Sequence, residues 1–123
     1  MIKRFSVGAT SLALAAVLFV RATKAEDDLD TVAKGRAIIE VNCARCHAIG
    51  KHDTSSHEEA PPFRVVVTRY PPQDLAEALA EGIVSGHPDM PQFVFPPSQI
   101  EAIVAYLNTL TSARSRRRTR TEI

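Results

Sequence analysis

The segment Cys43-Ala44-Arg45-Cys46-His47 is the part of the chain whose residue types and spacing are best suited to chemistry. Two residues separate the thiols, so a single turn of chain can present both sulfurs to one edge of a flat group. Haem has two vinyl groups on such an edge, and each can form a thioether with one cysteine. The imidazole that follows directly would then bind the iron from below. The motif predicts one covalently bound haem c that is attached at Cys43 and Cys46, with His47 as an iron ligand.

Two other kinds of site use a pair of cysteines at this spacing. A dithiol redox site of the thioredoxin type follows a strand in a βαβ unit, whereas the residues before Cys43 have the pattern of a helix. A structural zinc site needs four ligands, and the nearby His52 and His57 match no common zinc spacing. Both alternatives are therefore less favoured than haem attachment.

Met90 is the best candidate for the second axial ligand of the iron. It is the only Met besides Met1, and it lies in a loop over residues 86–97 that holds four prolines. Pro91 favours an extended Met90, and a stiff loop loses little entropy when a weak thioether ligand binds. A thioether ligand also raises the reduction potential relative to a second imidazole. The alternative role for Met90 is to fill the core. The rival ligands are His87 and then His52 or His57, although a histidine in a loop is more often solvated.

The hydrophobic periodicity predicts an all-α fold. Apolar residues fall on one helical stripe within each of three segments, at about 30–43, 74–83 and 98–111. The run from Phe63 to Tyr70 is ambiguous, because its three valines favour a strand but no partner strand is present, so we expect a short helix. Gly35 in the first helix costs about 1 kcal/mol relative to Ala. A close crossing of two helices would explain it.

The chain resembles the class I cytochromes c, in particular the small monohaem proteins of the bacterial periplasm. The resemblance covers about residues 30 to 111, and the residues that carry it are Gly35, the Cys43–His47 motif, Met90-Pro91 and Tyr106-Leu107. It implies the class I cytochrome c fold, with three to five helices packed around one covalently bound haem. It implies that the first and last helices cross at Gly35, with Tyr106 as a neighbour.

The resemblance also concerns the surroundings of the haem. A proline after the motif usually has a nearby carbonyl that accepts a hydrogen bond from the ligating His47, and Pro61 and Pro62 are equally suitable for this place. The chain departs from the family in having no Trp, a residue often found near a haem propionate.

Charge and hydropathy divide the chain into three parts. Residues 1–25 have a basic start and an apolar run, which predicts a signal peptide or, if it is not cleaved, an N-terminal anchor. Residues 26–113 are the predicted cytochrome c domain and carry six Lys and Arg against thirteen Asp and Glu. Residues 114–123 carry five Arg and one Glu, which predicts a basic disordered tail.

The function predicted from these features is electron transfer by a low-spin His/Met cytochrome that is exported to the periplasm, rather than enzymatic catalysis. The expected partners are redox proteins (a dehydrogenase, an oxidase or another cytochrome), and not nucleic acid. We expect a monomer, with the basic tail or an uncleaved signal as a route to membrane contact. One alternative is a dedicated haem subunit of a larger dehydrogenase or oxidase complex. A gas-binding or sensor haem protein is another, and it would require that Met90 does not close the iron site.

Overall fold

The computed structural model describes residues 10–82 and 86–121, and it describes side chains over 24–82 and 86–111. The chain divides into two compact units, Met1–Asp30 and Thr31–Ile123, and the site discussed below lies wholly in the second. Of the predicted signal peptide, residues 1–9 lie outside the described residues. None of the described helices is both long enough and apolar enough to cross a membrane.

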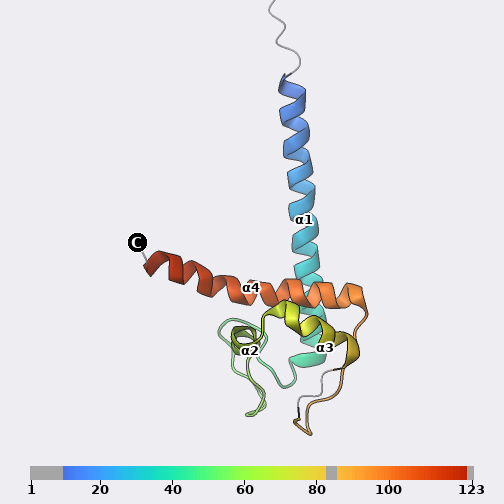
Figure 1. The fold of residues 1–123 in the computed structure, drawn as a ribbon, viewed down its shortest axis with the longest axis vertical. Helices are drawn as coiled ribbons and strands as arrows, with labels where there is room; N and C mark the ends of the chain where they lie inside the picture. Colours follow the sequence, from blue (N-terminus) through green and yellow to red (C-terminus); the bar gives the residue numbers. More distant parts are fainter. Residues whose placement is uncertain (1–9, 83–85, 122–123) are drawn as a thin grey trace, which may run out of the picture. The chain divides into compact units, whose positions relative to one another are not determined.

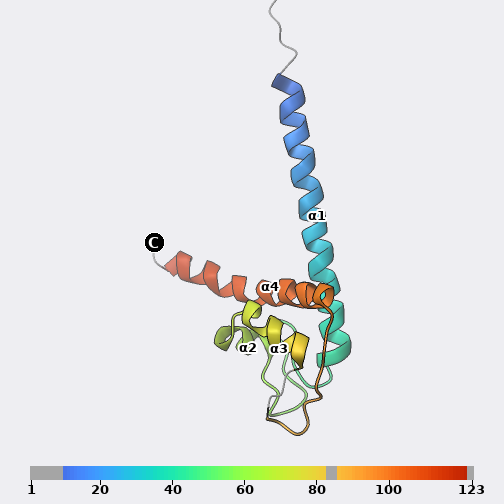
Figure 2. The same ribbon diagram turned by 45° about the vertical axis from the view of Figure 1, so that its right-hand side comes forward.

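The elements of the fold are helical, and no strand occurs in the described part of the chain (Figure 1). Helix α1 covers Thr10–Cys43, α2 covers Phe63–Arg69, a 3-10 turn η1 covers Pro72–Asp74, α3 covers Leu75–Glu81 and α4 covers Pro97–Thr121. The predicted all-α class is therefore confirmed, as is the choice of a helix for the valine-rich segment. In the second unit α2 and α3 both pack against α4, and Figure 2 shows the same arrangement after a turn about the vertical axis.

Prolines flank α2 at both ends. The Pro62 carbonyl accepts hydrogen bonds from Val65 and Val66 at the start of α2. Tyr70 ends α2 in an extended conformation, with φ −126° and ψ 115°, because the following Pro71 disfavours helical backbone at this position. Helix α2 packs against α4 instead of pairing with a strand, and Val67 is buried in the core.

Helix α4 is longer than the sequence predicted. The expected helix ended near residue 111 and a disordered tail was expected over 114–123, whereas α4 continues to Thr121. Arg is a good helix former, and no Gly or Pro follows Pro97, so the sequence contains no residue that must end the helix. The tail prediction considered only repulsion among the arginines and neglected their helix propensity.

Gly35 lies where α1 crosses α4, as the sequence predicted. It is buried, and a Cβ built at this position would overlap the backbone carbonyl of Ala102 on α4. Both figures show α4 passing across the C-terminal part of α1 (Figures 1 and 2). Ile39, one turn after Gly35 on α1, and Leu107, which follows Ala102 on α4, are the least exposed of the described side chains, at 1% each. The absence of a side chain at Gly35 therefore permits the close contact between α1 and α4.

We expect Gly35→Ala to lower the free energy of unfolding of the haem-loaded protein by about 1–3 kcal/mol. The new methyl group meets backbone rather than a flexible side chain, so α4 must move. The gain in helix propensity, about 1 kcal/mol, is too small to offset this overlap. Denaturant unfolding measures the difference. Ala37→Gly at an exposed site on the same helix is the matched control for propensity alone, and an unchanged or higher stability of Gly35→Ala would contradict the close crossing.

Candidate functional site

The two cysteines lie on one turn of chain at the end of α1. The Cys43 carbonyl accepts hydrogen bonds from the backbone N–H groups of Cys46, at 3.1 Å, and of His47, at 2.9 Å. The helical turn thus continues just past the last residue of α1. Residues three apart on such a turn lie on the same face, so the two thiols project together. Both are free and half-buried.

Burial changes the chemistry that the first thiol can do. Desolvation raises the pKa of Cys43 to about 11, so its sulfur stays a neutral thiol at neutral pH. Reactive dithiol sites need a thiol whose pKa is lowered instead. Nor does the described part of the chain gather three or more His, Cys, Asp or Glu side chains where they could hold a metal ion directly. The described site therefore has neither the lowered thiol pKa of a reactive dithiol nor the ligand cluster of a directly bound metal ion.

The imidazole of His47 is held in one orientation by its neighbours. Its Nδ1 lies 2.8 Å from the Pro61 carbonyl oxygen. Because a carbonyl can only accept, Nδ1 carries the proton and Nε2 is left with its lone pair. The ring of Phe63 packs on the imidazole with centroids 5.2 Å apart. This bond decides between the two prolines that the sequence left open, since the Pro62 carbonyl instead begins α2.

The loop after the motif is built around the Asp53 carboxylate. It accepts hydrogen bonds from the backbone N–H groups of Ile49, at 3.0 Å, and Gly50, at 3.1 Å. The N–H of Gly50 is the largest cause of a lowered Asp53 pKa, and the N–H of Ile49 and the charge of Arg64 lower it further. The carbonyl of Ile49 in turn accepts from the Tyr106 hydroxyl, at 2.8 Å. The family resemblance placed Tyr106 only near Gly35, and the structure shows that its hydroxyl also joins α4 to this loop.

A lowered pKa in the folded protein gives Asp53 a pH-dependent effect on stability. Its ionised form stabilises the fold at pH values above the unfolded pKa of about 3.8, and this stabilisation is lost as the pH falls through the lower folded value. We therefore expect Asp53→Asn to be less stable than the wild type at neutral pH, and the difference to shrink below about pH 4. Urea unfolding over a pH series measures it, with Glu77→Gln as a control for removal of an exposed charge. A difference that stayed constant with pH would contradict this role.

Met90 lies in the proline-rich loop that leads from α3 to α4. Its backbone N–H donates to the His87 carbonyl, at 3.2 Å, and its side chain is half-buried. The far end of the loop is fixed to α3, because the N–H of Phe95 donates to the Leu79 carbonyl at 2.9 Å. Phe95 also stacks on Phe93, with ring centroids 5.9 Å apart. These contacts fix the C-terminal end of the loop to α3.

All four predicted site residues line one cavity of about 870 Å³. Pockets that bury a cofactor commonly span roughly 300–1,000 Å³, so a haem is of suitable size for this one. Its walls are mainly apolar and come from every helix of the second unit; they include Ile39, Phe63, Val66, Leu79, Phe95 and Leu107. Two free thiols, an imidazole with an available Nε2 and a thioether open into this space. The chemistry of these donors fits a covalently attached haem.

The rival ligands are placed less favourably than Met90. His52 is exposed and does not line the cavity. His57 and His87 do line it, but each of these rings is paired with a carboxylate, Asp89 for the first and Glu59 for the second. Sequence reasoning missed these two pairs. The sequence His-x-acid occurs in both loops and marks the groups that could pair, but it does not show that the two loops meet.

Comparison with known protein families gives one match. Residues 30–107 match the family described as cytochrome C oxidase, cbb3-type, subunit III. The match starts at the end of the first unit and ends within α4, so it includes the motif, the cavity walls and the loop of Met90. Searches among curated proteins and among solved structures gave no significant match.

Proposed function

Because the chain belongs to the cbb3-type cytochrome c oxidase subunit III family, and thus to the class I c-type cytochromes, we propose that it transfers single electrons with His47 and Met90 as axial ligands. A domain of this family carries one covalently bound haem c with its iron. The observation that supports the ligand assignment best is the shared cavity, into which the motif and the loop of Met90 both open. Cys43 and Cys46 would hold the haem through thioethers.

Haem supplies an iron that alternates between the ferrous and ferric states, with a potential set by its ligands and surroundings. The residues of the chain keep that site unchanged during the cycle. Pro61 fixes the orientation and raises the basicity of the His47 ring. The apolar walls exclude water, and a low dielectric there favours the less charged form of the cofactor. No step of substrate binding at the metal is needed, since two protein ligands would fill both axial positions.

The partner of this domain can be transient or permanent. As a free carrier it would be exported and would exchange electrons with periplasmic redox proteins. The family to which the chain belongs favours the second candidate, a dedicated haem c subunit of an oxidase complex.

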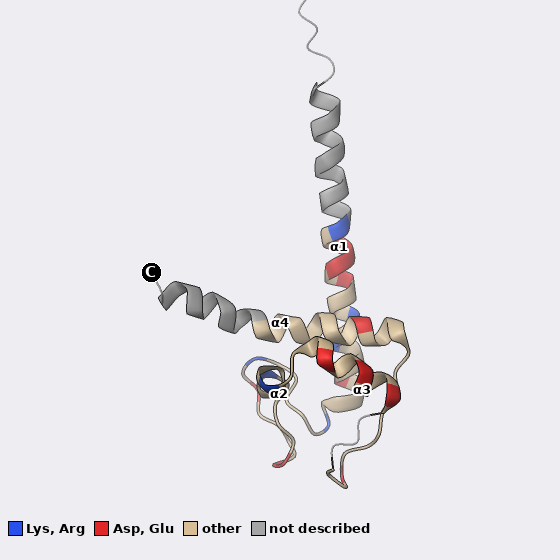
Figure 3. Cartoon of the chain, viewed as in Figure 1, with Lys and Arg blue, Asp and Glu red and all other residues tan. Residues whose placement is uncertain are grey.

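Acidic side chains gather along α3 (Figure 3), which carries Glu77 and Glu81 on its exposed side. Such a surface would attract a basic patch on the partner and make association sensitive to salt.

Absorption spectra of the haem-loaded protein test the ligand assignment. The oxidised protein should be low-spin and show the weak near-infrared band of a sulfur-to-iron bond, while a high-spin spectrum would contradict the proposal. Gel filtration of the protein from its native host distinguishes the two kinds of partner. Elution as a monomer supports the free carrier, and co-elution with an oxidase or a dehydrogenase supports the subunit.

A further inference from the structure

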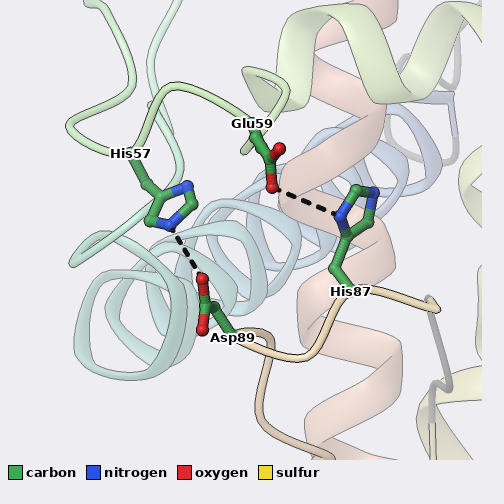
Figure 4. Close-up of polar contacts among 4 residues, drawn as sticks. All are labelled: His57, Glu59, His87 and Asp89. Atoms are coloured by element: carbon green, nitrogen blue, oxygen red, sulfur yellow. Dashed lines mark ion pairs between the residues drawn. The ribbon is translucent and has the colours of Figure 1, made fainter.

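Two loops that lie far apart in the sequence are joined by a pair of ion pairs. His57 and Glu59 belong to the loop before α2, and His87 and Asp89 belong to the loop before α4. The His57 Nε2 lies 3.5 Å from the Asp89 carboxylate, and the His87 Nδ1 lies 3.6 Å from the Glu59 carboxylate. Figure 4 shows that the pairing is reciprocal, because the histidine of each loop faces the acid of the other.

The four residues occupy a position that matters for the iron ligands. All of them line the cavity. Glu59 is two residues before Pro61, whose carbonyl orients the His47 ring, and Asp89 directly precedes Met90. The two pairs thus connect the loop that orients one proposed ligand to the loop that carries the other.

We propose that these four residues form a clasp that positions the loop of Met90 over the cavity. This inference rests on the proposed function in taking Met90 as the iron ligand. The clasp acts on the loop and touches no reacting atom, so its members are positioning residues. Because each histidine pairs with an acid from the other loop, sliding one loop past the other breaks both pairs together. The arrangement therefore fixes the register of the two loops as well as their distance.

The exposure of the four side chains to solvent limits how strongly the clasp holds the two loops together. The paired side chains are 37% and 73% exposed in the first pair and 57% and 66% in the second. Each exposed pair contributes little by itself. We therefore expect that removal of both pairs raises the fraction of molecules with an open loop by about two- to tenfold. An effect of this size changes how often the loop opens without unfolding the domain.

The test uses the haem-loaded protein with Glu59→Gln, Asp89→Asn and the double variant, all compared at the same pH. Amide hydrogen exchange of the backbone over 86–91 reports the opening directly, and the Met90 amide lies within this stretch. A second readout is the rate at which added imidazole displaces the sixth ligand. Glu58→Gln removes a neighbouring exposed carboxylate and is the matched control.

We expect exchange over 86–91 and imidazole binding to accelerate in the double variant, with global stability and the Glu58→Gln control nearly unchanged. His57→Gln combined with Asp89→Asn should accelerate opening no more than either change alone, since both remove the same pair. Unchanged exchange in the double variant would overturn the clasp. Absence of the sulfur-to-iron band in the wild type would instead refute the assignment of Met90, and the exchange measurement would still decide whether the clasp exists.

Discussion

Replacing both Cys43 and Cys46 by alanine should give a chain from which denaturation removes all haem. Without thioethers the cofactor would be held only by its axial ligands and the apolar walls, and these are lost on unfolding. We also expect the double variant to lose much of its helical structure when the haem is absent. Without haem the cavity of about 870 Å³ would be unfilled, and the apolar side chains that line it, such as Phe63 and Val66, would lack packing contacts on that side.

The single variants and a neighbouring residue provide the controls for this experiment. Cys43→Ala and Cys46→Ala should each retain part of the covalent haem, because one thioether is still able to form. Arg45→Ala, an exposed position between the cysteines, should retain all of it. Covalent haem is measured by the absorbance that stays with the chain after denaturing gel electrophoresis. Full retention in the double variant would mean that some other residue holds the cofactor.

Met90→Leu should remove the near-infrared sulfur-to-iron band and lower the reduction potential. Leucine has nearly the volume of methionine. If Met90 only filled the core, the change would therefore lower the free energy of unfolding by less than about 1.5 kcal/mol. It has no sulfur, however, and the sixth position of the iron would open to solvent or added ligands. The potential should fall by on the order of 0.1 V or more, within the roughly 0.8 V range that axial ligands control. Redox titration followed by absorbance measures the shift.

The rival ligands are tested in the same assay. His52→Gln and His87→Gln should keep the band and most of the potential, since the first ring is exposed and the second is paired with Glu59. If Met90→Leu left the spectrum and potential unchanged while His87→Gln altered both, the ligand would be His87. The rest of the fold and the attachment at the cysteines would be unaffected by that result.

The sequence was most informative where one residue type is required by covalent chemistry or by space. The spacing of Cys43, Cys46 and His47 follows from the dimensions of the group that they would bind. Gly35 was predicted at a close crossing because a glycine inside a helix is otherwise unfavourable, and the carbonyl of Ala102 occupies the place of its missing side chain. In both cases a local rule was enough.

Features that depend on which loops meet could not be predicted from the sequence. Either Pro61 or Pro62 could supply a carbonyl, and the choice depends on where α2 begins. The pairing of His57 with Asp89 joins residues 32 positions apart, and no local pattern sets that contact. The length of α4 was missed for another reason, because the prediction considered the repulsion among the arginines and left out their helix propensity.

The central claim is that one haem is joined to this chain through two sulfurs, and intact mass spectrometry tests it most directly. The protein would be produced in a host that has the machinery for haem attachment, denatured in acid and weighed. We predict a mass that exceeds the mass of the polypeptide by one haem, and a shift that maps to the peptide with Cys43 and Cys46. A denatured chain with only the polypeptide mass would contradict the account.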